Sequence, residues 1–136
     1  MNDDYVLVEI KKDGRAVGII RCNKEISQFI GNPNYPNIIT LSTSLKTNNN
    51  GFPTTEENAK FFEIEDKIIE YFHHNNNSLY AGAITGEGLK RYMIYTFNVD
   101  NFKDKFNKVQ QTVSNYSFKI VVQEDKGWDS YKKFCP

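Results

Sequence analysis

The sequence predicts a single α+β domain, with two helices packed on one face of a mainly antiparallel β-sheet. The length of 136 residues suits one domain, and no repeat or linker interrupts the chain. The expected elements follow the order β-β-β-α-β-β-α-β. Without the first two strands this order is βαββαβ, which is typical of ferredoxin-like folds. We therefore expect residues 1–136 to form a two-layer sandwich, in which a ferredoxin-like core is extended by an N-terminal β-hairpin.

The hairpin is predicted by two strand-like apolar runs with a turn between them. The runs are residues 5–10 and 16–22, and Asp13-Gly14 separates them. An Asp-Gly pair favours a type I′ turn, because both central residues of that turn need positive φ. The two runs should therefore pair as antiparallel strands.

A connecting segment and a third strand follow the hairpin. Residues 23–37 are interrupted by glycine and proline, and Ile26, Phe29 and Ile30 indicate a short helical turn within them. Residues 38–45 alternate apolar and polar side chains. This alternation indicates a half-buried strand.

The first long helix has the clearest start signal in the chain. Thr54 lies three residues before Glu57, as in a capping box. Apolar residues then recur at helical spacing and predict a buried stripe: Phe61, Ile64, Ile68 and Phe72. We expect the helix to end at His73-His74.

The second half of the chain repeats the pattern of strands followed by a helix. Residues 79–84 and 90–97 are strand-like and flank a glycine-bearing hairpin loop at 85–88. The second of these strands carries apolar or aromatic side chains on both faces, which places it in the middle of the sheet. Asn101 is expected to open the second helix, and residues 116–123 alternate as a last strand.

The C-terminal tail contains Trp128 and Tyr131 and is expected to form a helical turn. A strand with apolar side chains on both faces needs a cover on its second face. Three covers fit the sequence: the N-terminal hairpin, the tail, or a second subunit in a homodimer.

Charge and cysteine content narrow the function classes. Lys and Arg together number 17 and so do Asp and Glu, which argues against a nucleic-acid partner. Cys22 and Cys135 match no metal or redox spacing. We expect Cys22 to be a small buried side chain and Cys135 a free thiol, with a disulfide between them as the alternative. The acidic N-terminus predicts no signal peptide, and no apolar run is long enough to span a membrane, so the expected location is the cytoplasm.

The chain offers few residues for catalysis, metals or cofactors. His73 and His74 are its only histidines, and adjacent helical residues point about 100° apart, so we expect capping of the helix rather than metal binding. The glycines at 82, 86 and 88 fit no phosphate-binding motif. We therefore predict no catalytic residue, no metal and no cofactor, and the protein leans away from being an enzyme.

A candidate binding site combines one cation with three aromatic residues. Arg91 and Tyr95 are four apart on one expected strand and share a face, while Trp128 and Tyr131 are three apart in the tail. Arg offers a planar fork for a carboxylate or phosphate, and Trp and Tyr offer broad contacts. The alternative is that the tail packs as a lid and the aromatic residues close the core.

Several short motifs are spread over the second and third thirds of the chain. They are Gly51-Phe52-Pro53-Thr54 with Glu56-Glu57, Ile64-Glu65-Asp66, Tyr80-Ala81-Gly82 with Thr85, Gly88, Arg91 and Tyr95, and Trp128 with Tyr131 and Pro136. Together they resemble the bacterial family called domain of unknown function 695, and the likeness runs from about Pro36 to the end of the chain. The resemblance implies a small bacterial cytoplasmic domain with no assigned catalytic residues, whose relatives sometimes accompany a domain similar to regulator of ribonuclease activity B.

Two functions remain from the sequence. The first is a non-catalytic binding or regulatory module that acts through contacts with an unidentified protein partner. The alternative is a small-molecule-binding or enzymatic domain with a cleft near Arg91 and its aromatic neighbours. A convergent polar pocket that holds a carboxylate would favour the alternative.

Overall fold

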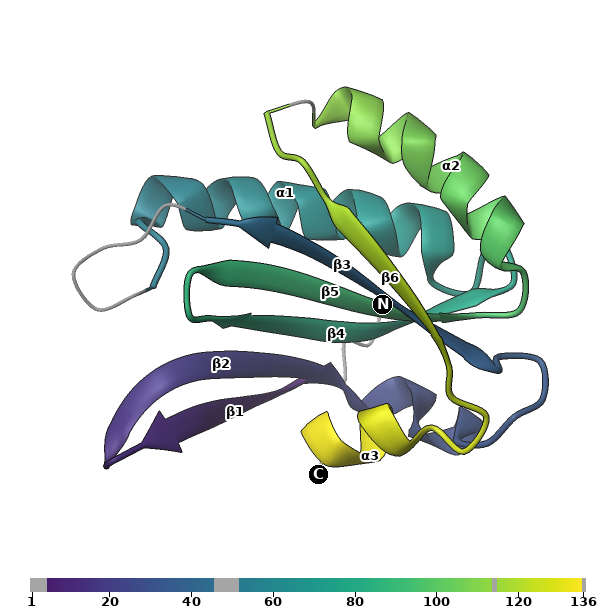
Figure 1. Cartoon of the computed structure of the whole chain (residues 1–136), viewed down its shortest axis with the longest axis horizontal. Coiled ribbons are helices and arrows are strands. Elements are labelled where there is room, and N and C mark those ends of the chain that lie inside the picture. Colours follow the sequence, from purple (N-terminus) through teal and green to yellow (C-terminus); the bar gives the residue numbers. More distant parts are fainter. Residues whose placement is uncertain (1–4, 46–51, 114, 136) are drawn as a thin grey trace.

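Antiparallel strands of unequal length form one sheet, in the order β1-β2-β4-β5-β3-β6 (Figure 1). The structure is a computed structural model that describes residues 5–45, 52–113 and 115–135. The strands are β1 (Tyr5–Lys12), β2 (Arg15–Asn23), β3 (Asn37–Ser44), β4 (Ser78–Gly86), β5 (Leu89–Thr96) and β6 (Lys119–Glu124). As the sequence predicts, β5 lies inside the sheet, between β4 and β3.

The β1–β2 hairpin extends the sheet at one edge by pairing with β4. Its turn residues Asp13 and Gly14 have φ of 54° and 76°, the positive values that the Asp-Gly pair predicts. The hairpin thereby lies beside the rest of the sheet and contributes one side of the site described below.

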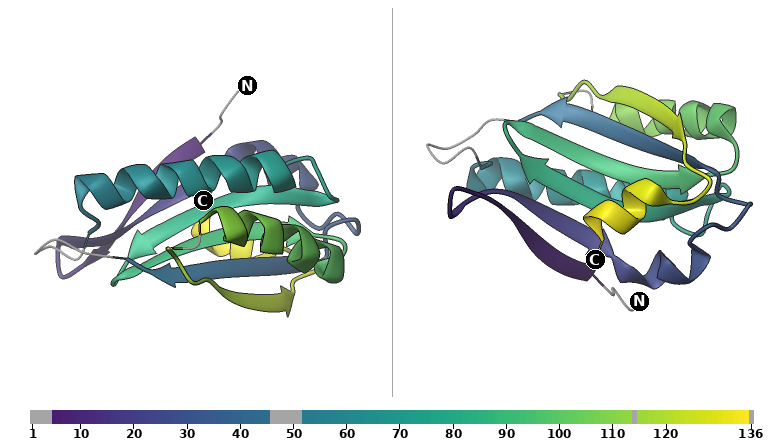
Figure 2. Two further views of the ribbon diagram at one scale, coloured as in Figure 1. Left: turned by 90° about the horizontal axis from the view of Figure 1, so that it is seen from above. Right: turned by 60° about the horizontal axis from the view of Figure 1, so that its bottom comes forward.

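Two long helices lie on one face of the sheet, and two short helical segments lie on the other (Figures 1 and 2). The long helices are α1 (Thr55–Phe72) and α2 (Val99–Thr112), and the short segments are the 3₁₀-helix η1 (Lys24–Phe29) and α3 (Asp129–Phe134). In the described ranges, no helix has both the length and the apolar character needed to cross a membrane.

The helix starts follow capping side chains. Thr54 caps α1, because its Oγ1 accepts a hydrogen bond from the backbone N–H of Glu57 at 3.2 Å. The second helix begins earlier than the sequence suggests, at Val99 rather than Asn101. Asn98 is its N-cap, and the side chain of Asn98 accepts from the N–H of Asn101 at 2.9 Å.

The alternating side chains of the sheet feed two hydrophobic clusters, one on each face. On β5, Tyr92 and Ile94 pack with the apolar stripes of α1 and α2. Met93 and Tyr95 point to the opposite face and pack with Trp128 and other residues of the tail. The tail is therefore a cover for the second face of β5, one of the three covers that the sequence allows.

A disulfide joins the tail to the hairpin. Cys22 and Cys135 are bonded across 113 residues of sequence, with their Cα atoms 5.5 Å apart. The expectation that Cys135 is a free thiol is therefore wrong, because the packing of the tail brings it against β2. Cys22 is buried, as expected.

Candidate functional site

A cleft opens between the N-terminal half of α1 and the neighbouring strands of the sheet. We call it the α1 cleft, and its volume is about 390 Å³. Most of its walls are apolar, and a few polar groups converge on it. The lining residues are Leu7, Ile19, Arg21, Phe52, Pro53, Thr55, Asn58, Phe61, Phe62, Glu65, Ala83, Thr85 and Lys90.

The strand register explains why these side chains share one face. Alternate residues of a strand point to the same side of a sheet. Thr85 on β4 lies opposite both Ile19 on β2 and Lys90 on β5, while Arg21 lies opposite Ala83. All five therefore project toward α1.

A buried hydrogen-bonded network forms the floor of the cleft. The Arg21 guanidinium pairs with Oε1 of Glu65, and the Tyr80 hydroxyl donates to Oε2 of the same carboxylate at 2.6 Å. Arg21 also lies over the ring of Tyr5, 3.9 Å from its centroid. Glu65 on α1 is thereby tied to both β2 and β4.

The electrostatics of the network follow from burial and from Glu65. Burial raises the pKa of Tyr80 well above its ordinary value, and the nearby Glu65 carboxylate raises it further. Burial alone would lower the pKa of Arg21, but Glu65 outweighs that effect and raises it. Arg21 therefore keeps its charge beside Glu65, and Tyr80 is a neutral donor.

Lys90 brings a second cation to the cleft. Its Nζ donates to Oγ1 of Thr85 at 2.7 Å and lies 5.6 Å from the ring centroid of Tyr92. Burial lowers the pKa of Lys90; Glu65 raises it and Arg21 lowers it further. The amine therefore lies in a poorly solvated place with one hydrogen-bond acceptor.

The residues that the sequence singled out lie on the other face of the sheet. Tyr95, Trp128 and Tyr131 come together there, with the Trp128 ring stacked 4.0 Å from that of Tyr95. All three are fully buried, and none of them lines the α1 cleft. Arg91 shares a face with Tyr95, and its Nε is buried without a hydrogen-bond partner in the described part of the chain.

Lys90 is the functional candidate that the sequence reasoning missed. It is the neighbour of Arg91, and adjacent strand residues point to opposite faces. The sequence did hold a signal for it: Lys90, Tyr92 and Ile94 are each two residues apart and therefore share a strand face. Tyr92 and Ile94 pack against α1 and α2, so Lys90 faces the same helices. The contact of Glu65 with Arg21 had no such signal, since 44 residues separate them.

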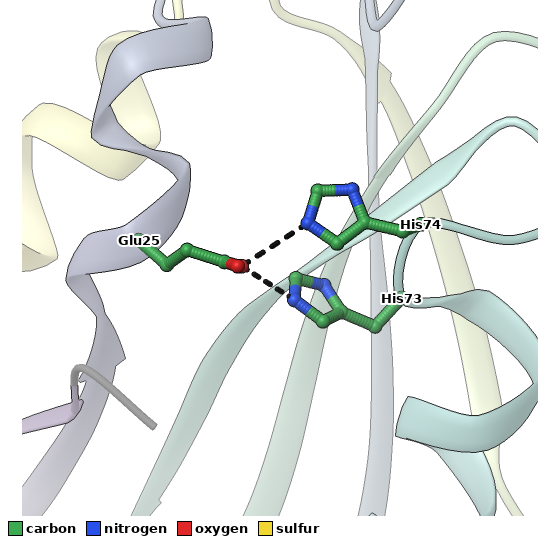
Figure 3. A group of neighbouring side chains, drawn as sticks. All are labelled: Glu25, His73 and His74. Carbon is green, nitrogen blue, oxygen red and sulfur yellow. Dashed lines mark hydrogen bonds and ion pairs between the residues drawn. The ribbon is translucent and has the colours of Figure 1, made fainter. Parts of the chain in front are cut away.

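Both histidines meet one carboxylate at the end of α1 (Figure 3). Oε1 of Glu25, on η1, lies 2.6 Å from Nε2 of His73 and 3.2 Å from Nε2 of His74. The sequence expectation assumed helical geometry at both histidines. Instead α1 ends at Phe72 with an extended His73 as its C-cap, and His74 has a positive φ of 56°, so the two rings lie on the same side.

The ligand atoms of this Glu25–His73–His74 cluster all lie within 4.8 Å of one another, but their hydrogen bonds do not suit a metal ion. A metal-binding imidazole offers one nitrogen to the ion and donates a hydrogen from the other. In His73, Nδ1 accepts from the backbone N–H of Tyr80 at 3.1 Å, so the hydrogen is on Nε2 and is donated to Glu25. The cluster is a link between η1 and the end of α1.

Comparison with known proteins gives a family but no relative of known activity. The sequence model of a family described as a family of unknown function (DUF695) matches residues 10–135. No curated protein and no solved structure matches the chain. The family match starts in β1, well before Pro36, the residue from which the sequence predicted the likeness.

Proposed function

Because this chain belongs to a family of unknown function (DUF695), we propose its function from the structure: it is a non-catalytic binding module that holds an apolar ligand in the α1 cleft. The observation that carries the proposal is the cleft itself. Its volume of about 390 Å³ lies in the range of small-molecule sites, and such sites combine apolar walls with a few converging polar groups.

The polar side chains of the cleft are better suited to binding a ligand than to catalysing a reaction. Both carboxylate oxygens of Glu65 accept hydrogen bonds, one from Arg21 and one from Tyr80, so this carboxylate is not placed to act as a catalytic base. His73 and His74 do not line the cleft, so in the described residues no imidazole base faces a hydroxyl there. These features support a site that positions a ligand.

A protein partner is the second candidate, and the rim of the cleft favours it. Leu7, Ile19 and Phe62 are exposed apolar side chains from three different elements, with 69%, 39% and 51% of their surfaces open to solvent. An apolar side chain of a partner could cover this rim and enter the cleft. A second copy of the chain is the homodimeric form of this proposal, and light scattering at micromolar concentration tests it.

We also propose the ferredoxin-like description of the core and a cytoplasmic location. The strand order β4-β5-β3-β6, with α1 and α2 between those strands in sequence, supports the ferredoxin-like description.

The Cys22–Cys135 disulfide weighs against the cytoplasmic location, because such bonds persist mainly in oxidising compartments. Denaturing cells rapidly in an alkylating reagent tests the location: labelled cysteines support the cytoplasm, and cysteines protected until reduction oppose it.

Binding of a neutral apolar dye such as Nile red tests the proposed function. The dye should bind the wild type, and its ¹H–¹⁵N shift changes should centre on Ala83, Thr85 and Phe62. Asn58→Trp fills the mouth of the cleft from α1 and should weaken binding at least tenfold. Asp66→Trp is the control, an exposed position on the same helix that does not line the cleft. Equal binding by both variants would refute the proposal.

A further inference from the structure

We propose that the ligand of the α1 cleft is a carboxylate with an apolar body, and that Lys90 binds its charged end; this rests on the proposed function above. The proposal starts from the charges of the cleft. Arg21 and Glu65 form a pair that is close to neutral as a unit. Among the described lining residues Lys90 is the remaining charged one, so together they carry one positive charge in excess.

The surroundings of Lys90 leave its amine short of partners. A lysine ammonium has three hydrogen-bond donors, and Thr85 Oγ1 accepts one of them at 2.7 Å. Lys90 forms no ion pair with any carboxylate in the described ranges. On two sides it faces aromatic rings, those of Phe61 at 6.0 Å and Tyr92 at 5.6 Å. Two donors are therefore left for a ligand.

A poorly solvated ammonium in an apolar cavity selects an anion. The charged form of a buried amine is costly unless an opposite charge lies near it. Lys90 already loses part of its stabilisation by water, as its lowered pKa indicates. A bound anion would restore the favourable environment of the charge, which a neutral ligand of the same shape cannot do.

The donor set points to a carboxylate rather than a phosphate. Phosphate sites usually combine several donors, from an arginine fork or a run of backbone N–H groups. Of the cleft residues that the structure describes, Arg21 alone has a guanidinium, and Glu65 occupies it. One ammonium matches one negative charge, and the apolar walls match a hydrocarbon or aromatic body.

The test compares 4-phenylbutyrate with its uncharged amide, 4-phenylbutanamide, in ¹H–¹⁵N titrations of the full chain. We expect the carboxylate to bind the wild type at least tenfold more tightly, with shift changes at Thr85 and Ala83. Lys90→Met keeps the length of the side chain without its charge and should reduce the ratio of the two affinities to about one. Lys133→Met, at an exposed position of α3, is the control and should keep the ratio.

The outcomes separate this proposal from the one that it rests on. Equal binding of acid and amide by the wild type, with shifts in the cleft, would overturn the carboxylate and leave the binding module intact. This comparison needs no variant, so it decides the matter even if Lys90→Met does not fold. A preference for the acid that persists in Lys90→Met would overturn the role of Lys90. Absence of binding by both compounds would overturn both proposals.

Discussion

The ring of Trp128 stacks on that of Tyr95, with centroids 4.0 Å apart and planes only 9° from parallel. The two residues are held further by hydrogen bonds. The indole N–H of Trp128 donates to the carbonyl of Tyr35 at 2.9 Å, and the Tyr95 hydroxyl donates to Asp125 at 2.7 Å and accepts from the N–H of Tyr131 at 3.1 Å. Their full burial makes this pair the attachment of the tail to the sheet.

Removing the indole should therefore destabilise the whole domain. We expect Trp128→Ala to lower the free energy of unfolding by about 3–5 kcal/mol, the usual cost of truncating a large buried aromatic side chain. Lys132→Ala, at an exposed position of α3, should change it by less than about 0.5 kcal/mol. Urea denaturation followed by circular dichroism measures both. A Trp128→Ala protein as stable as the control would show that the tail is not part of the core.

The disulfide should reinforce the same attachment. A bond that closes a loop of this length restricts the unfolded chain and is worth about 4–5 kcal/mol in the chain-entropy description. Dithiothreitol should lower the stability of the wild type by an amount of this order and leave Cys135→Ala unchanged. Mass spectrometry after alkylation in denaturant checks the bond. Two alkylated cysteines in protein that has not been reduced would mean that the bond does not form.

Two buried tyrosines offer a matched comparison for the floor of the α1 cleft. Tyr80 donates to the carboxylate of Glu65 at 2.6 Å, whereas Tyr92 donates to the backbone carbonyl of Phe61 at 2.8 Å. Hydrogen bonds to charged groups are the stronger kind, so Tyr80→Phe should cost about 2 kcal/mol and Tyr92→Phe about 1 kcal/mol. Thermal and urea unfolding of the two variants measure the difference. Equal costs would mean that Glu65 finds another donor when the hydroxyl is removed.

Local sequence patterns predicted the elements of this fold well. Asp13-Gly14 and Thr54 act through their own backbone conformations and side chains, so the turn and the helix start could be located without knowledge of the tertiary structure. The two-sided apolar pattern of β5 likewise predicted its central place. These signals depend on neighbours within a few residues.

The α1 cleft and the histidine cluster could not be predicted in the same way. Arg21 and Glu65 meet only because the hairpin pairs with β4 and α1 crosses above both, which no spacing along the chain encodes. The placement of the two histidines depended on where α1 ends, with His73 in an extended conformation and His74 at a positive φ. The disulfide of Cys135 could not be predicted either, because it depends on the path of the tail across the sheet, which brings Cys135 to Cys22.

The Glu25–His73–His74 cluster predicts a loss of stability at acid pH. Burial would raise the pKa of Glu25, but the hydrogen bonds that its carboxylate forms with His73 and His74 outweigh burial and lower it. A carboxyl group with a lower pKa in the folded state than in the unfolded state contributes stability above its ordinary pKa. That contribution is lost as the pH falls through the lowered value.

Glu25→Gln should remove this dependence, because the amide keeps a hydrogen-bond acceptor for His73 but does not titrate. Between about pH 6 and about pH 3, the wild type should lose more stability in urea denaturation than Glu25→Gln does. Glu63→Gln, at an exposed position of α1, should follow the wild type over the same range. The account of the cluster is refuted if wild type and Glu25→Gln lose stability in parallel, because the carboxylate of Glu25 would then gain nothing from the two imidazoles.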